Sequence, residues 1–325
     1  MNNLRLTIVL FILAAALAPA LLVSWTSGQE SRAVQAPAAS PHGPVVPPGF
    51  KTAPWQGVSK KRADGAKPLE TAAQPAPGAA PDPAAEPPTA PEAHAPVLVE
   101  LFTSEGCSSC PPAEKVINDL AAAEPTDSRV LYLAYHVDYW DNLGWKDRFA
   151  DKAFSDRQRA YAAAFASGSV YTPQTIINGE LAFVGSDRIQ TERSLSEAKR
   201  RPTTMSISAM HQELKPGQAV AVTIERTSAA GAEWPKDLRL CAAIVEDGLT
   251  TTVARGENQG RTLKHDRVVR AFTEITPSDP ARPTTLELTL PADLKPDKAT
   301  IVVFAQDTST MKVLAAARAK PRTKD

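Results

Sequence analysis

The sequence has few cysteines, no excess of either charge and no internal repeat. Only 3 of its 325 residues are cysteine, which is too few for a small domain held together by disulfides. Lysine and arginine together number 36, as do aspartate and glutamate, so the formal net charge is zero and nucleic-acid binding is not expected. No repeat at a solenoid period is visible. The length instead fits about two domains of roughly 150 residues each.

Residues 1–28 predict a signal peptide or an N-terminal membrane anchor. Arg5 precedes an apolar, uncharged run at residues 6–25, which at about 20 residues is long enough to span a bilayer. Ala16-Leu17-Ala18 has the small residues of a cleavage site, but Pro19 follows it, so the anchor is the favoured interpretation. In either case we expect export to the periplasm or the extracellular face, with residues 6–25 as a tether to the inner membrane.

Residues 29–95 predict a disordered, proline- and alanine-rich linker. About half of the prolines of the chain fall here, for example in Pro75-Ala76-Pro77. Such a composition does not bury enough apolar surface to offset the entropy of ordering it, so we expect an extended, semi-stiff spacer. A tether that lifts the folded part off a membrane and a segment without a specific role are both open interpretations.

Residues 96–201 predict an α/β thioredoxin-like domain. Buried-strand runs and helical spacing alternate along this segment, and Asn178-Gly179 is a strong hairpin signal. Strands are expected at 97–102, 130–135, 175–177 and 181–185. Helices are expected at 111–123, 149–165 and 189–199. The order β-α-β-α-β-β-α is that of thioredoxin.

Residues 202–325 predict an all-β, sandwich-like C-terminal domain. Short alternating runs recur at regular intervals with little helix between them, and turn clusters such as Lys215-Pro216-Gly217 separate them. The strands are expected at 205–208, 219–226, 238–245, 268–275, 285–290, 300–305 and 312–315.

The motif Cys107-Ser108-Ser109-Cys110 is the feature with the clearest chemistry. It lies between a predicted strand and a predicted helix, so Cys107 faces the positive end of the helix dipole and the unpaired N–H groups there. Both features lower the pKa of a thiol and make it nucleophilic. We therefore predict that Cys107 attacks a disulfide and that Cys110 resolves the mixed disulfide.

Other interpretations of the cysteines are open. A structural zinc site normally needs four ligands, and Cys241 stands apart in an apolar run as a small buried hydrophobe, so zinc is disfavoured. A permanent disulfide between Cys107 and Cys110 would close only a short loop and add little stability. No cofactor and no bound metal are expected under the redox interpretation.

Residues elsewhere are candidates for the surroundings of the dithiol. In a thioredoxin-like unit, Pro173 would be a cis-proline beside the sulfurs, and as part of Tyr171-Thr172-Pro173 it would shape a groove for the substrate. Asp138 and Trp140 follow the second strand, where the strand ends of an α/β sheet line a crevice. His136 is either a proton shuttle or third metal ligand, or a local partner of Asp138 or Asp141. For Trp140, core packing is the favoured alternative.

The polar segment at residues 247–270 is longer and more charged than a simple turn requires. It would fold over the dithiol or form the interface between the two predicted domains, and the interface is the favoured interpretation. A solvated hairpin is the remaining alternative.

Several motifs occur together in this chain. They are Val99-Glu100-Leu101-Phe102-Thr103-Ser104-Glu105-Gly106 with the cysteine motif and Pro111-Pro112-Ala113, His136-Val137-Asp138-Tyr139-Trp140-Asp141, Gly144-Trp145-Lys146-Asp147, Val170-Tyr171-Thr172-Pro173-Gln174, Arg255-Gly256-Glu257-Asn258 and residues 265–270. In combination, from residue 96 onward, they resemble an exported thioredoxin-like bacterial family known as domain of unknown function 1223. The resemblance implies a thioredoxin-like fold and export, and it implies no substrate. The long proline-rich spacer departs from the short secretion signal expected of that family.

Three functional hypotheses follow from the sequence. The first is an exported thiol–disulfide oxidoreductase whose partner is a thiol- or disulfide-containing protein or small molecule. The second is a soft-metal protein that binds copper through Cys107, Cys110 and His136, against which the scarcity of methionine, 4 residues, counts mildly. The third is a non-enzymatic binding module whose disulfide is static.

Overall fold

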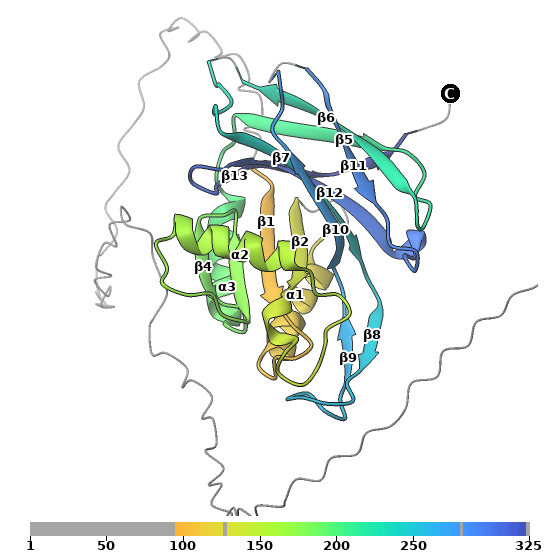
Figure 1. Cartoon of the computed structure of the whole chain (residues 1–325). Coiled ribbons are helices and arrows are strands. Elements are labelled where there is room, and N and C mark those ends of the chain that lie inside the picture. Colours follow the sequence, from red (N-terminus) through yellow and green to blue (C-terminus); the bar gives the residue numbers. More distant parts are fainter. Residues whose placement is uncertain (1–94, 126–128, 230, 280–281, 323–325) are drawn as a thin grey trace, which may run out of the picture. The chain divides into compact units, whose positions relative to one another are not determined.

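The computed structural model describes residues 95–125, 129–229, 231–279 and 282–322 (Figure 1). The expectations for residues 1–28, and for 29–95 apart from its last residue, lie outside the described part of the chain. Within that part, no helix combines the length and the apolar character that crossing a membrane requires. The described residues form a mixed α/β structure with extensive sheets and few helices.

The predicted helices and strands are all present, with ends shifted by a few residues, and three short strands are additional. The helices are α1 Cys110–Ala123, α2 Lys152–Ala164 and α3 Arg188–Lys199, with 3-10 turns η1 Asp138–Trp140 and η2 Pro296–Lys298. The strands are β1 Val97–Thr103, β2 Val130–His136, β3 Gln174–Ile177, β4 Leu181–Val184, β5 Met205–His211, β6 Ala219–Ser228, β7 Leu238–Glu246, β8 Leu249–Thr252, β9 Thr262–His265, β10 Val268–Ile275, β11 Thr284–Thr289, β12 Ala299–Asp307, β13 Val313–Arg318 and β14 Lys320–Pro321. The additional strands are β8, β9 and β14.

One eight-stranded sheet contains strands from both halves of the described chain. Its order is β13-β12-β7-β10-β2-β1-β3-β4. β1 and β2 are parallel, and β3 is antiparallel to β1. β10 joins β2 at the register Val268↔Ala134, where the N–H of Ala134 donates to the carbonyl of Arg267 at 2.9 Å. The boundary expected after residue 201 therefore falls within a unit whose two halves share a continuous sheet.

A second, four-stranded sheet of order β11-β6-β5-β14 packs on the C-terminal half of the large sheet. Val222 and Ile224 of β6 share one core with Leu240 and Ile244 of β7 and with Val303 of β12. The apolar positions that alternate along these strands thus face each other between the two sheets.

β1 is buried on both faces because helices cover each of them. Val97, Val99 and Leu101 pack with α1 and α3, whereas Leu98 and Phe102 pack with α2. A strand covered on both sides has an almost continuous apolar sequence rather than an alternating one. The end of β1 leads directly into the cysteine turn and then into α1, so the rigid sheet positions both cysteines.

Candidate functional site

Cys107 and Cys110 form a disulfide at the start of α1, with their Cα atoms 5.4 Å apart. The turn that carries them follows β1, and the N–H of Cys110 donates to the carbonyl of Cys107 at 3.3 Å. Both cysteines are 0% exposed, whereas Ser108 and Ser109 between them are exposed. The pair is therefore closed and covered, and a partner reaches the sulfurs only after its cover moves.

The start of α1 offers fewer N–H groups to a sulfur anion than an ordinary helix does. Pro111 and Pro112 stand at its first positions and have no N–H. The hydroxyl of Ser109 lies 3.3 Å from Sγ of Cys107. Stabilisation of a Cys107 thiolate would therefore come from this hydroxyl and from the helix dipole, and less from free backbone donors.

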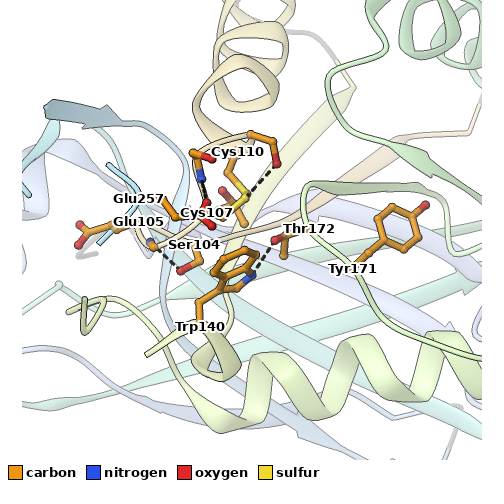
Figure 2. Close-up of a disulfide and its surroundings, with 12 residues drawn as sticks. Ser104, Glu105, Cys107, Cys110, Trp140, Tyr171, Thr172 and Glu257 are labelled. Atoms are coloured by element: carbon orange, nitrogen blue, oxygen red, sulfur yellow. Dashed lines mark hydrogen bonds between the residues drawn. A yellow bond between two sulfur atoms is a disulfide. The ribbon is translucent and has the colours of Figure 1, made fainter. Parts of the chain in front are cut away.

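The segment between β8 and β9 covers the cysteine turn. The side-chain amide of Asn258 donates to the carbonyls of Glu105 and Cys107, at 2.8 and 2.9 Å. A carboxylate oxygen of Glu257 accepts the N–H of Ser108 at 3.0 Å (Figure 2). The polar segment at residues 247–270 thus folds over the disulfide, as one interpretation of the sequence predicted. It also joins the two halves of the described chain, as the favoured interpretation predicted, because the carbonyl of Arg267 accepts the N–H of Ala134 and His265 contacts Glu114. We call residues 253–261 the covering loop.

Trp140 connects the cysteine turn to the loop before β3. Its indole N–H donates to the hydroxyl of Thr172 at 2.8 Å, and its Cβ would lie 3.3 Å from a Cβ at Gly106 (Figure 2). Thr172 precedes Pro173, and the peptide bond between them is cis, which confirms that prediction. Trp140 is partly buried and packs against the core that contains Phe102 and Tyr135. It also lies beside the disulfide (Figure 2).

Two of the predicted groove residues point elsewhere. Tyr171 lies away from the disulfide (Figure 2), and burial raises the pKa of its hydroxyl. Asp138 accepts a hydrogen bond from the hydroxyl of Ser155 on α2, and its N–H donates to the same hydroxyl at 3.1 Å. These contacts tie η1 to α2 and leave Asp138 no contact with the cysteines.

His136 is fully buried at the end of β2. Its Nδ1 lies 2.6 Å from a carboxylate oxygen of Asp147. The expectation that its local partner is Asp138 or Asp141 is therefore wrong, because the chain after η1 returns Asp147 to the end of β2. Asp147 also accepts the N–H of Glu105 at 2.8 Å, which connects His136 to the residues just before Cys107.

His136 belongs to a buried group of acids and imidazoles that includes Glu105, two residues before Cys107. We call Glu105, Glu114, His136, Asp147 and His265 the carboxylate–histidine cluster. Nδ1 of His265 lies 2.6 Å from Glu114, and its Nε2 lies 3.5 Å from Glu105. The hydroxyl of Thr103 donates to Glu114 at 2.7 Å, and the indole of Trp145 donates to Glu105 at 2.7 Å.

The charges of this cluster stabilise one another. Burial lowers the pKa of His265, but hydrogen bonds and the charges of Glu105 and Glu114 outweigh it and raise that pKa to about 10. Burial raises the pKa of Glu114, yet the contact with His265 leaves it below its ordinary value. The pKa of Asp147 is likewise lowered, because the charge and hydrogen bond of His136 outweigh burial.

Sequence reasoning missed the roles of Glu114, His265 and Asp147. His265 lies in β9, where the exposed and buried positions alternate and His265 shares the buried face with Leu263. Recognising this short strand would have placed His265 inward. Among the described residues, the side chains that could hold a metal are Glu114, His136 and His265, a group without cysteine. His136 is thus grouped with carboxylate and imidazole rather than with the sulfurs.

The chain matches a family model and several solved structures. A family model described as "Protein of unknown function (DUF1223)" matches residues 98–306. No curated protein matches the chain. A crystal structure of a protein from Agrobacterium tumefaciens has 26% identity and a TM-score of 0.49, and the match covers 72% of this chain and 97% of that one.

Two solved structures from Porphyromonas gingivalis also match. HBP35 has 13% identity and a TM-score of 0.52, with 71% of this chain and 78% of that one covered. A domain of the outer membrane lipoprotein Omp28 has 17% identity and a TM-score of 0.24, with 37% and 92% covered. The likeness to HBP35 concerns the fold alone.

Proposed function

This chain belongs to the DUF1223 family, whose function is unknown, and we propose that it is a thiol–disulfide oxidoreductase with a thioredoxin-like N-terminal half. The observation that carries the proposal is the Cys107–Cys110 disulfide at the first turn of α1, directly after the buried strand β1. Two cysteines spaced in this way at a helix start are suited to reversible exchange. The strand order β2-β1-β3-β4, with β3 antiparallel to its neighbours, supports the thioredoxin-like assignment.

The exchange balances in two steps. In the reduced protein, the Cys107 thiolate attacks one sulfur of a substrate disulfide, and the other substrate sulfur leaves as a thiolate. The Cys110 thiolate then attacks Sγ of Cys107, which releases the second substrate thiolate and forms the Cys107–Cys110 disulfide. Two electrons pass from the protein to the substrate, and the reverse sequence oxidises a dithiol partner.

The covering loop and Trp140 control access in this proposal. Both sulfurs are buried, so the partner has to displace the hydrogen bonds of Asn258 and Glu257 before it contacts Cys107. Pro173, with Thr172, would border the groove that then opens. We do not assign His136 a proton-transfer role at the sulfurs, because its ring lies among Glu114, Asp147 and His265.

The partner would be a thiol- or disulfide-containing protein or small molecule. We place the reaction outside the cytoplasm, because residues 1–28 are expected to direct export and an oxidising compartment maintains such a disulfide.

Trapping of the mixed disulfide tests the proposal. The full chain is reduced, freed of reductant and mixed with glutathione disulfide, and adducts are identified by intact-mass and peptide mass spectrometry. We expect Cys110→Ser to retain one glutathione on Cys107. We expect Cys107→Ser to retain none on Cys110. Cys241→Ala is the matched control and should exchange like the wild type, because Cys241 is buried and its burial raises the pKa of its thiol.

The burial of both cysteines favours a second candidate, a non-enzymatic binding module with a static bridge. The same experiment separates the two. Absence of an adduct in folded Cys110→Ser, or an equal adduct in Cys107→Ser, would remove the oxidoreductase and leave the static bridge.

A further inference from the structure

We propose that Glu114, His136 and His265 form a binding site for a divalent transition-metal ion, with Zn²⁺ as its representative. One ligand atom of each residue lies within 4.8 Å of those of the other two, and all three residues are buried. Two imidazoles and a carboxylate are a ligand set that zinc takes in proteins. The site is distinct from the dithiol, since it contains no cysteine.

Asp147 orients His136 for such a role. It lies 2.6 Å from Nδ1 of His136, and it also accepts the N–H groups of Glu105 and Phe149, at 2.8 and 2.9 Å. A carboxylate accepts and does not donate, so the proton of the neutral ring stays on Nδ1 and the lone pair of Nε2 is free. This carboxylate–histidine pairing is the usual support behind a metal-binding imidazole. Asp147 is therefore a positioning residue.

Three buried polar atoms in the cluster support a cation there. Nε2 of His136 has no hydrogen-bond partner among the described residues, and Nε2 of His265 and Oε1 of Glu105 have only each other, at 3.5 Å. Buried polar atoms are rarely left without a partner, and each one calls for a bound ion, a water or a functional reason. Glu105 lies 3.5 Å from His265 and so offers a further oxygen beside the three proposed ligands.

The surroundings hold the two rings in place and supply negative charge. The ring of Phe149 packs edge-on against His136 and His265, with centroids 5.4 and 5.8 Å away. The cluster has three carboxylates and two imidazoles. A divalent ion that displaces the proton which His265 holds between Glu114 and Glu105 would neutralise these carboxylates in its place. Because the ligands come from α1, β2 and β9, the ion would also fasten the β8–β9 hairpin to the sheet.

The test keeps the disulfide closed so that Cys107 and Cys110 are not ligands. The full chain is unfolded in urea without reductant, refolded with a small excess of Zn²⁺, passed through a desalting column and analysed for metal per chain. We expect one tightly held Zn²⁺ per chain, and with Co²⁺ in place of Zn²⁺ a visible absorption typical of nitrogen and oxygen ligands in low coordination. Wild-type protein that folds and retains no metal would overturn the proposal and leave a bridging water as the occupant.

Matched variants identify the ligands. His136→Gln and Glu114→Gln should weaken Zn²⁺ binding by roughly tenfold or more, and Asp147→Asn by roughly 10- to 100-fold with a changed Co²⁺ spectrum. His211→Gln is the control, because His211 is also buried but lies on β5 in the other sheet. Far-UV circular dichroism confirms that each variant folds. Retention of one Zn²⁺ at wild-type affinity by folded Glu114→Gln and His136→Gln would also overturn the site, whatever the outcome of the thiol-exchange experiment.

Discussion

At the scale of single residues, Asn258 ties the covering loop to the cysteine turn. It is fully buried and donates to two carbonyls of the cysteine turn, those of Glu105 and Cys107. Under the proposed function these hydrogen bonds have to break before a partner reaches the sulfurs. We therefore expect Asn258, which is far from Cys107 in the sequence, to limit the reactivity of the disulfide.

Asn258→Ala should accelerate reduction of the disulfide. Loss of buried hydrogen bonds costs about 1–3 kcal/mol, and if opening precedes reaction, this raises the open population by roughly 5- to 150-fold. The rate of reduction by a water-soluble phosphine, followed by thiol labelling, measures the effect. Asn142→Ala, at an exposed asparagine, serves as the control and should not change the rate. An unchanged rate in Asn258→Ala would show that the covering loop does not limit access.

At the scale of the elements, α2 is joined to the sheet by a buried ion pair rather than by apolar contacts alone. Arg157 of α2 donates to Glu100 of β1 at 2.7 Å and to Gln306 of β12 at 3.0 Å. The hydroxyl of Tyr161 also contacts Glu100. Glu100 is the one acidic position in the apolar strand β1, and Arg157 explains why it is tolerated there.

Arg157→Ala should strongly destabilise the protein. It leaves the Glu100 carboxylate buried without its charged partner, which costs about 3–5 kcal/mol. Arg159→Ala on the same helix is the matched control, because Arg159 pairs with Asp156 at the surface and such pairs contribute about 0–1 kcal/mol. Urea unfolding followed by circular dichroism gives both values. Equal losses in the two variants would contradict the assigned role of the buried pair.

The turn after β12 gives a pH-dependent prediction. Burial raises the pKa of Asp307, but hydrogen bonds from Ser309 and Thr310 outweigh it, so its folded pKa lies below its ordinary value. A carboxyl whose pKa is lowered by folding stabilises the folded state at pH values above its pKa in the unfolded chain. This stabilisation is lost as the pH falls through its pKa in the folded protein. Asp307→Asn should therefore cost roughly 0.5–1.5 kcal/mol at neutral pH, and the difference should shrink below about pH 4. Urea unfolding of both proteins at neutral pH and below about pH 4 checks this. An equal difference in unfolding free energy at the two pH values would show that the Asp307 carboxylate does not stabilise the fold.

At the scale of the whole described structure, the shared sheet makes the two halves depend on each other. β10 pairs with β7 on one side and with β2 on the other. Cys241 and Val245 of β7 belong to the same core as Phe154 and Tyr161 of α2. This core is shared by the two halves, whereas the core between the two C-terminal sheets and the core under α1 and α3 each lie within one half.

Residues 202–325 expressed alone should therefore not fold cooperatively. Removal of the N-terminal half exposes the edge of β10 and one apolar face of β7, β10 and β12. Near-UV circular dichroism and thermal unfolding, with residues 95–325 as the comparison, measure this. A sharp unfolding transition in the 202–325 fragment would show that the C-terminal half is an independent domain.

The sequence predicts local structure well and long-range contacts poorly. The apolar run of β1 and the Asn178-Gly179 turn, where both residues have positive φ, are local signals and were predicted. The pairing of β10 with β2 and the contact of His265 with Glu114 join residues far apart in the chain. No local periodicity encodes such contacts, so the continuous sheet and the cluster emerged only from the structure. The cysteine motif was found because its chemistry depends on the spacing of the two cysteines and on the strand and helix beside them, which are local signals.

Equilibration of the full chain with glutathione tests most directly whether the cysteine pair is a working redox couple. The protein is incubated at a series of ratios of reduced to oxidised glutathione, quenched with acid and alkylated, and the fraction with a closed Cys107–Cys110 disulfide is measured by mass spectrometry. We expect a reversible two-electron transition that is the same from the oxidised and the reduced side, while the protein stays folded. A disulfide that stays closed at every ratio in the folded protein would contradict the proposed function.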